Sequence, residues 1–375
     1  MVSTKHFFRL ILSLFIFVVI VSFPSTVIGQ TPTIVPTLQK PQTYEATIID
    51  IVQKSKKTNG VLNDSQDIKL KLEEGSEKGK NVTTSVMVNP GGKQQEYVKG
   101  ERVVVQISQM PDGSELIYIV DYVRTTPLFL LLFLFILIVF IIGRWRGLMS
   151  IIGMIFSFLI IIQFIIPSII AGNNPILISL LASTIVLPVT FYISHGFNAK
   201  TTISIVGTCI ALFLTGILAI IFVYAVKLSG FDSDEAMFLQ TIMGEKIDVR
   251  NLLLAGIIIG ASGVLDDITI SQTAIVEKLI DVQKRPSFWQ LYNQAMDVGR
   301  DHIASLVNTI FLVYVGASLP LFLLFSHANE SYMKVINQEI VATEIVRTLV
   351  SSIGIISAVP ITTLLACIYL KKRST

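Results

Sequence analysis

The sequence predicts a polytopic α-helical membrane protein that carries a small all-β barrel outside the membrane. Of the 375 residues, 52% are hydrophobic and only 15% are charged, whereas charged residues make up about a quarter of an ordinary soluble domain. The apolar residues lie in long blocks after residue 126, and turn signals and polar residues concentrate before it. Most blocks approach the ~20 residues that a bilayer-crossing helix needs. We therefore expect seven spans plus an N-terminal signal or anchor helix.

Composition also argues against several classes of function. A net charge of +3 is too small for a nucleic-acid binder that relies on bulk charge. The two cysteines, Cys209 and Cys367, lie in apolar runs without a CxxC partner, so neither a disulfide framework nor a cysteine zinc site is expected. The sequence contains no GxSxG, P-loop or zincin motif. We expect no enzymatic activity, no cofactor and no metal centre.

Residues 1–30 have the layout of a secretory signal. Lys5 and Arg9 flank the apolar stretch 7–21, and a small-residue site ends at Gly29. Cleavage after Gly29 and retention as an anchor both remain open. In either case the following segment is exported.

Residues 31–125 are predicted to form the extracytoplasmic barrel. Their alternating runs are separated by turn signals such as Asn59-Gly60 and predict strands at 44–52, 67–72, 81–88, 101–108 and 115–122. Five short strands are typical of a small barrel of the OB or SH3-like kind. The proline-containing stretch 31–42 is interpreted as a tether.

Residues 126–375 are predicted to form the membrane domain, with spans at 127–143, 147–166, 175–193, 202–226, 251–267, 303–325 and 347–370. Among the Lys and Arg residues that flank the predicted spans, 12 lie on the side expected inside the cell and 5 on the outer side, which favours a cytoplasmic C-terminus, and a cytoplasmic N-terminus if the first helix is retained. The connections 232–249 and 268–285 show mixed apolar patterns and are expected to be helices at the outer and inner interfaces.

The candidate site lies at the predicted inner ends of two spans. Gly256, Gly260, Gly263 and Asp267 follow at i, i+4, i+7 and i+11, so they share one helical face beside Asp266. Such glycines let another helix approach closely. The plainer interpretation is that the glycines only pack helices, while the two carboxylates end the span or cap the next helix.

The next span offers a second polar stripe. Asp301, Ser305 and Asn308 lie at i, i+4 and i+7, and Asn308 must find a partner or water at its depth. We expect this stripe to face Asp266 and Asp267. The alternative interpretation is that Asn308 only forms a structural hydrogen bond to a neighbouring helix. His195, Asp297, Arg300 and His302 are secondary candidates, interpreted mainly as hydrogen-bonded or solvated groups.

Two acidic stretches also resemble a known family. GVLDDITISQ at 263–272 and NQAMDVGRDHI at 293–303 resemble the YibE/F-like family of bacterial multi-spanning membrane proteins, and Ser194-His195-Gly196 before Lys200-Thr201 agrees with that pattern. The resemblance covers most of the chain, from the barrel to the last span. It implies the architecture and a bacterial plasma membrane, and it implies no reaction or ligand.

The leading functional hypothesis is a transporter or channel-like protein with an acidic site that faces the cytoplasm. Its partners would be the lipid bilayer and an inorganic ion or small solute, and no nucleic acid. The alternative is a membrane scaffold or envelope-sensing protein whose barrel binds a protein partner. An intramembrane enzyme is a third hypothesis, for which no motif is present.

Overall fold

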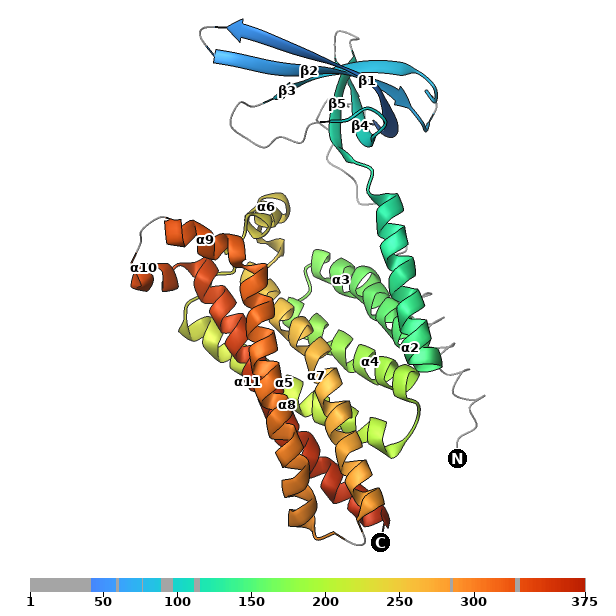
Figure 1. Cartoon of the computed structure of the whole chain (residues 1–375). Helices are drawn as coiled ribbons and strands as arrows, with labels where there is room; N and C mark the ends of the chain where they lie inside the picture. Colours follow the sequence, from blue (N-terminus) through green and yellow to red (C-terminus); the bar gives the residue numbers. More distant parts are fainter. Residues whose placement is uncertain are drawn as a thin grey trace. The chain divides into compact units, whose positions relative to one another are not determined.

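The structure is a computed structural model that describes residues 42–58, 61–75, 77–88, 97–110, 115–283, 286–327 and 331–374. The predicted signal segment and most of the predicted tether lie outside these residues. The chain divides into two compact units, with a boundary between Ile138 and Val139. Each unit is described by itself (Figure 1).

The first unit contains a five-stranded antiparallel sheet in the order β3-β2-β1-β4-β5. The strands are β1 (Gln42–Thr58), β2 (Val61–Leu72), β3 (Asn81–Val88), β4 (Arg102–Gln109) and β5 (Glu115–Tyr122). Residues of alternating position, such as Ile68, Leu70 and Leu72, bury their side chains on one face, as period-2 patterning requires.

The two outer strands of this sheet approach each other. Thr84 of β3 donates its hydroxyl hydrogen to the Ile117 carbonyl oxygen of β5 at 2.5 Å. Lys80, just before β3, forms an ion pair with Glu115 at 3.2 Å. All five predicted strands are confirmed, and β1 and β2 extend beyond their predicted bounds because they pair along their whole length.

The second unit is helical. Its first helix is α2 (Thr125–Ile160), whose first residues belong to the sheet-containing unit. The elements that follow are the π-helix η1 (Ile161–Ile165), α3 (Ile166–Ile170), α4 (Pro175–His195), α5 (Ala199–Ala225), α6 (Asp234–Met243), the 3-10 turn η2 (Gly244–Lys246), α7 (Val249–Val282), α8 (Phe288–Ala317), α9 (Leu319–His327), α10 (Tyr332–Ile336) and α11 (Glu339–Ser374). Several begin at a side-chain cap: Asn174, Asn198, Ser233 and Asp248 each accept hydrogen bonds from backbone N–H groups of the first turn. The helix predicted within 232–249 is confirmed as α6.

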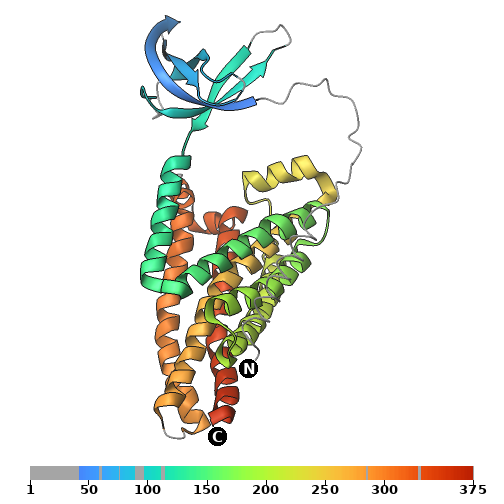
Figure 2. The same cartoon turned by 90° about the vertical axis from the view of Figure 1, so that its right-hand side faces the viewer.

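Helices α5, α7 and α11 pack against one another and form the centre of this unit (Figure 1). Helix α8 packs against α11, and Figure 2 shows its orange ribbon running along the length of the bundle. Close approach depends on glycine: a Cβ atom added to Gly207 of α5 would lie 2.5 Å from the Thr362 hydroxyl of α11. Gly354 of α11 meets Thr215 of α5 in the same way.

Within the described residues, five helices are long and apolar enough to cross a membrane, and six if a bent pair counts as one span. The predicted spans 127–143 and 147–166 fall in one continuous helical run, Thr125–Ile170, which is made of α2, η1 and α3. Arg144 interrupts this run with non-helical angles of φ 50° and ψ −139°. The predicted span 303–325 is the bent pair, α8 and α9, with a 66° change of direction. The chain thus fits a membrane protein, and the predicted count of seven is not reproduced by this criterion.

The helix that contains the predicted fifth span extends well beyond it. Helix α7 continues through Asp266 and Asp267 to Val282, so the segment 268–285 is its second half and not a separate interfacial helix. The sequence offers no helix stop before Pro286, and the continuing helix buries Ile268, Gln272 and Val276. The two carboxylates therefore lie mid-helix.

Candidate functional site

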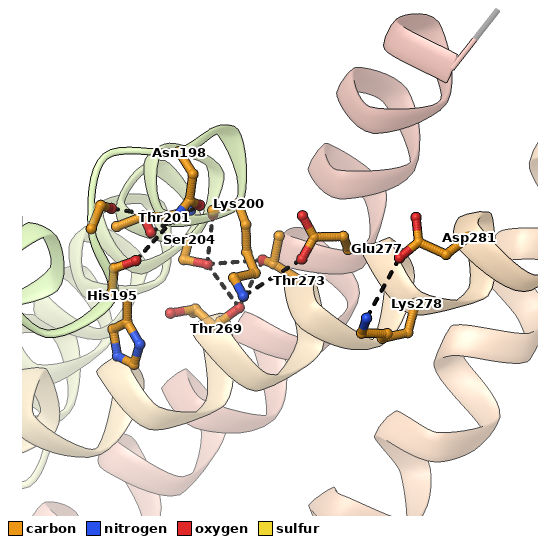
Figure 3. A network of polar contacts seen from close by, with 11 residues as sticks. His195, Asn198, Lys200, Thr201, Ser204, Thr269, Thr273, Glu277, Lys278 and Asp281 are labelled. Carbon is orange, nitrogen blue, oxygen red and sulfur yellow. Dashed lines mark hydrogen bonds and ion pairs between the residues drawn. The ribbon is translucent and has the colours of Figure 1, made fainter. Parts of the chain in front are cut away.

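Polar contacts between α5 and α7 show how far along the length of the helical bundle Asp266 lies. Two antiparallel pairs visible in Figure 3 set the register, Lys200 with Glu277 at 3.5 Å and Ser204 with Thr273 at 2.9 Å. A third pair, Thr208 with Thr269 at 2.7 Å, continues it by one more turn. One more turn places Leu212, the middle residue of α5, opposite Leu265, and both side chains are buried in one apolar cluster. Asp266 is also roughly 25 Å from either end of α7 at ~1.5 Å per residue. It lies near the middle of the bundle.

Asp266 lines a cavity of about 390 Å³ between α2, η1, α4 and α7, which we call the hydroxyl-lined cavity. Its walls alternate small polar and apolar side chains: Ser150, Gly153, Met154, Ser157, Ile161, Ile165, Ala182, Ser183, Val186, Leu187, Thr190, Ser194, Ile259, Ser262, Gly263 and Asp266. Gly153 of α2 faces α4 across this cavity, since a Cβ atom added there would be in ordinary van der Waals contact with Thr190, at 3.6 Å. Asp266 is the one ionisable side chain in this lining.

One oxygen of the Asp266 carboxylate has no partner. Its Oδ1 atom is buried and accepts no hydrogen bond from any described residue. Leaving a buried charged oxygen without a hydrogen bond costs several kcal/mol, on the order of the penalty for an unpaired ion. Such a group at mid-bundle is by default a functional candidate.

A second cavity, of about 530 Å³, adjoins the first and is called the charged cavity. It is lined by Arg146, Ser150, Ser194, His195, Gly263, Val264, Asp266, Asp267, Ile268, Ile270 and Leu306. Four of these residues, Ser150, Ser194, Gly263 and Asp266, line both cavities. The two cavities therefore share a wall that includes Asp266, and the charged groups Arg146, His195 and Asp267 belong only to the second.

The predicted glycine face of α7 does not pack a helix. A Cβ atom at Gly256, Gly260 or Gly263 would meet no described atom within 4 Å. All three are exposed, and Gly263 borders both cavities. The expected close helix approach at these positions is not found, because α7 packs on α5 and α11 through its buried face.

The α8 candidates do not join this site. Asp301, Ser305 and Asn308 are exposed, and none lines either cavity. Helix α8 instead buries Gly299, which faces Val359 and Gln272. Asn308 lies nine residues after Gly299, two and a half turns on, and so points to the opposite face.

The secondary candidates divide in the same way. His195 ends α4, lines the charged cavity, and accepts a hydrogen bond from the Asn198 amide at its carbonyl oxygen (Figure 3). Asp297 and Arg300 form an exposed ion pair at 2.5 Å, and His302 is exposed. No cluster of three or more His, Cys, Asp or Glu residues that could hold a metal occurs in the described part of the chain.

The hydroxyl groups on α2 and α4 were not among the predicted site residues. Ser150, Gly153 and Ser157 follow at i, i+3 and i+7, and Ser183, Thr190 and Ser194 at i, i+7 and i+11, which places each set on one helical face. This spacing was visible in the sequence. The π-helix η1, a distortion frequent at functional sites, had no sequence signal.

These features define a helical, membrane-type protein with a polar cavity near mid-bundle. The family model described as YibE/F-like protein matches residues 131–372. The chain belongs to the YibE/F-like family, as the two acidic stretches indicated. The match begins after β5, so it does not include the sheet that the resemblance was expected to cover. Searches of the curated proteins and of the solved structures found no match.

Proposed function

We propose that this protein is a transporter or channel-like protein that moves a small solute or ion through the two joined cavities. The observation that carries the proposal is the unpartnered Asp266 oxygen at mid-bundle. A buried carboxylate oxygen without a hydrogen-bond partner is stabilised when it binds a ligand or a proton and when water reaches it. The proposal assigns Asp266 a binding role and no catalytic one.

The proposal includes a membrane topology, which gives the number of crossings and the side of the membrane on which the charged cavity opens. The separation of α2 at Arg144 and the bent pair α8–α9 support seven crossings, with the Lys and Arg residues of short loops on the cytoplasmic side of a bacterial plasma membrane. The charged cavity, with Arg146 and His195, then opens toward the cytoplasm. The near approach of β3 and β5 supports a small extracytoplasmic barrel of the OB or SH3-like kind.

Transport is tested with the full chain in proteoliposomes. Gradients of NaCl, KCl or pH are imposed, and ion movement is followed with a membrane-potential dye and a trapped pH indicator. We expect protein-dependent flux that falls at least tenfold in Asp266→Asn. Asp297→Asn is the matched control, because Asp297 is exposed on α8 and lines neither cavity. No wild-type flux, or equal flux in Asp266→Asn, would refute the proposal.

A partner-binding role for the sheet is the second candidate. Leu116, Tyr118 and Val120 alternate along β5 and are 45%, 39% and 54% exposed, which forms an apolar stripe on an outer strand. Crosslinking in native membranes, from a photoreactive residue placed at Tyr118, is expected to capture a protein partner. Crosslinking equal to that from the exposed Gly79 turn would count against this role.

A further inference from the structure

Three of the six hydroxyl groups that line the hydroxyl-lined cavity donate their hydrogens to backbone carbonyl oxygens. Ser157 donates to the Gly153 carbonyl oxygen at 3.0 Å, Thr190 to Val186 at 2.9 Å, and Ser262 to Ile259 at 2.7 Å. A hydroxyl has one hydrogen and two lone pairs. These three oxygens therefore offer the cavity lone pairs and no donor.

The charge of this lining is also one-sided. Asp266 is negative when ionised and no Lys, Arg or His belongs to the described lining of this cavity. An anion would lie beside the Asp266 carboxylate and the three acceptor oxygens, and only the remaining hydroxyls of this lining, Ser150, Ser183 and Ser194, could donate to it. A positively charged ligand complements the carboxylate and can also be bound by the lone pairs of the hydroxyl oxygens.

The number of carboxylates indicates the charge of that ligand. Divalent Ca²⁺ takes roughly six to eight oxygen ligands, often from several carboxylates. The cavity supplies one carboxylate, so a single positive charge leaves the site neutral. Hydroxyl and carboxylate oxygens are ligands suited to hard cations.

We propose that the hydroxyl-lined cavity binds one monovalent cation, with Asp266 as its counter-charge and the Ser157, Thr190 and Ser262 oxygens as neutral ligands. This inference rests on the proposed function and names its substrate class. Asp266 and Ser262 lie four residues apart on one face of α7, and Thr190 approaches α2 at Gly153, so three helices contribute to one site.

The test measures equilibrium binding of ²²Na⁺, ⁸⁶Rb⁺ and methylammonium to the purified full chain in detergent. At least one is expected to bind at one per chain. Asp266→Asn should weaken that binding at least tenfold and Ser262→Ala by two- to tenfold, while Asp297→Asn leaves it unchanged. Asp266→Glu retains the charge and should keep measurable binding, which covers the case in which Asp266→Asn does not fold.

Two results would overturn the inference. One is the absence of saturable binding for all three cations. The other is that Mg²⁺ or Ca²⁺ at equal concentration displaces the bound cation completely. Because binding is measured without a gradient, flux that persists without cation binding would refute this inference alone. Cation binding without flux would refute the proposed function alone.

Discussion

The Ser204 hydroxyl of α5 donates to the Thr273 hydroxyl of α7 at 2.9 Å, deep between two helices. Together with the Thr208–Thr269 contact it fixes how far α7 is displaced along α5. This register, and not the end of a span, determines where Asp266 lies. The α5–α7 contacts should therefore contribute measurably to the free energy of unfolding.

Replacing Ser204 by Ala removes the single hydroxyl hydrogen that lies within hydrogen-bond distance of both the Thr273 hydroxyl and the Thr269 carbonyl oxygen. We expect a loss of about 1 kcal/mol in unfolding free energy, the order found for buried and membrane hydrogen bonds. Thr184→Ala is the control, because the exposed Thr184 bonds only to its own helix. Unfolding in a denaturing detergent series measures both, and equal stability of the two variants would contradict the assigned role.

Gly354→Ala should lower stability by about 1–3 kcal/mol, since overpacking of a well-packed contact costs that much. Its added methyl group would overlap Thr215 of α5. The double variant with Thr215→Ala should recover most of the loss. Gly260→Ala, where a Cβ atom meets no described atom within 4 Å, should have no destabilising effect. A similar loss at both glycines would show that packing is not the cause.

The acid pH dependence of the chain should include a contribution from Asp121. The Arg124 guanidinium, 2.6 Å away, and the Tyr122 backbone N–H lower the pKa of this carboxyl below its ordinary value. A lowered folded-state pKa stabilises the fold above the unfolded value, and the contribution disappears as the pH falls through the folded value. Thermal unfolding of wild type and Asp121→Asn should differ at pH 7 and converge in acid, and a difference that grows in acid would contradict this sign.

Flux through Asp301→Asn should equal that of the wild type within twofold. The residue is exposed on α8 and lines neither cavity. This outcome separates the site described here from one shared between α7 and α8. A tenfold loss of flux in Asp301→Asn, with normal expression, would restore the shared site.

Local patterns predicted much of the fold. Alternation and turn residues located all five strands, and β3 and β5 have their predicted bounds. Asp266 could be selected as a candidate because a carboxylate in an apolar run is conspicuous. Its unpartnered oxygen and its neighbours on α2 and α4 depend on helix packing, which periodicity alone does not determine.

Two predictions differ from the structure, the end of the helix at Asp267 and the direction in which the polar stripe of α8 faces, and each has a physical reason. Hydropathy ends a span where charges appear, so α7 was expected to end at Asp267. A helix ends only where its backbone hydrogen bonds end, and here that is at Val282. Similarly, Asp301, Ser305 and Asn308 share a face, but the small residue Gly299 on the other side of α8 decides which face packs.

The most direct measurement is water accessibility at Ser262, one turn from Asp266. In a full chain with Cys209 and Cys367 replaced by Ala, Ser262→Cys should react with a small, positively charged methanethiosulfonate reagent in intact membranes. Ile258→Cys, one turn earlier on the same helix and fully buried, should not react. Failure of Ser262→Cys to react, while a cysteine at the exposed Ser287 does, would contradict a wet cavity at Asp266.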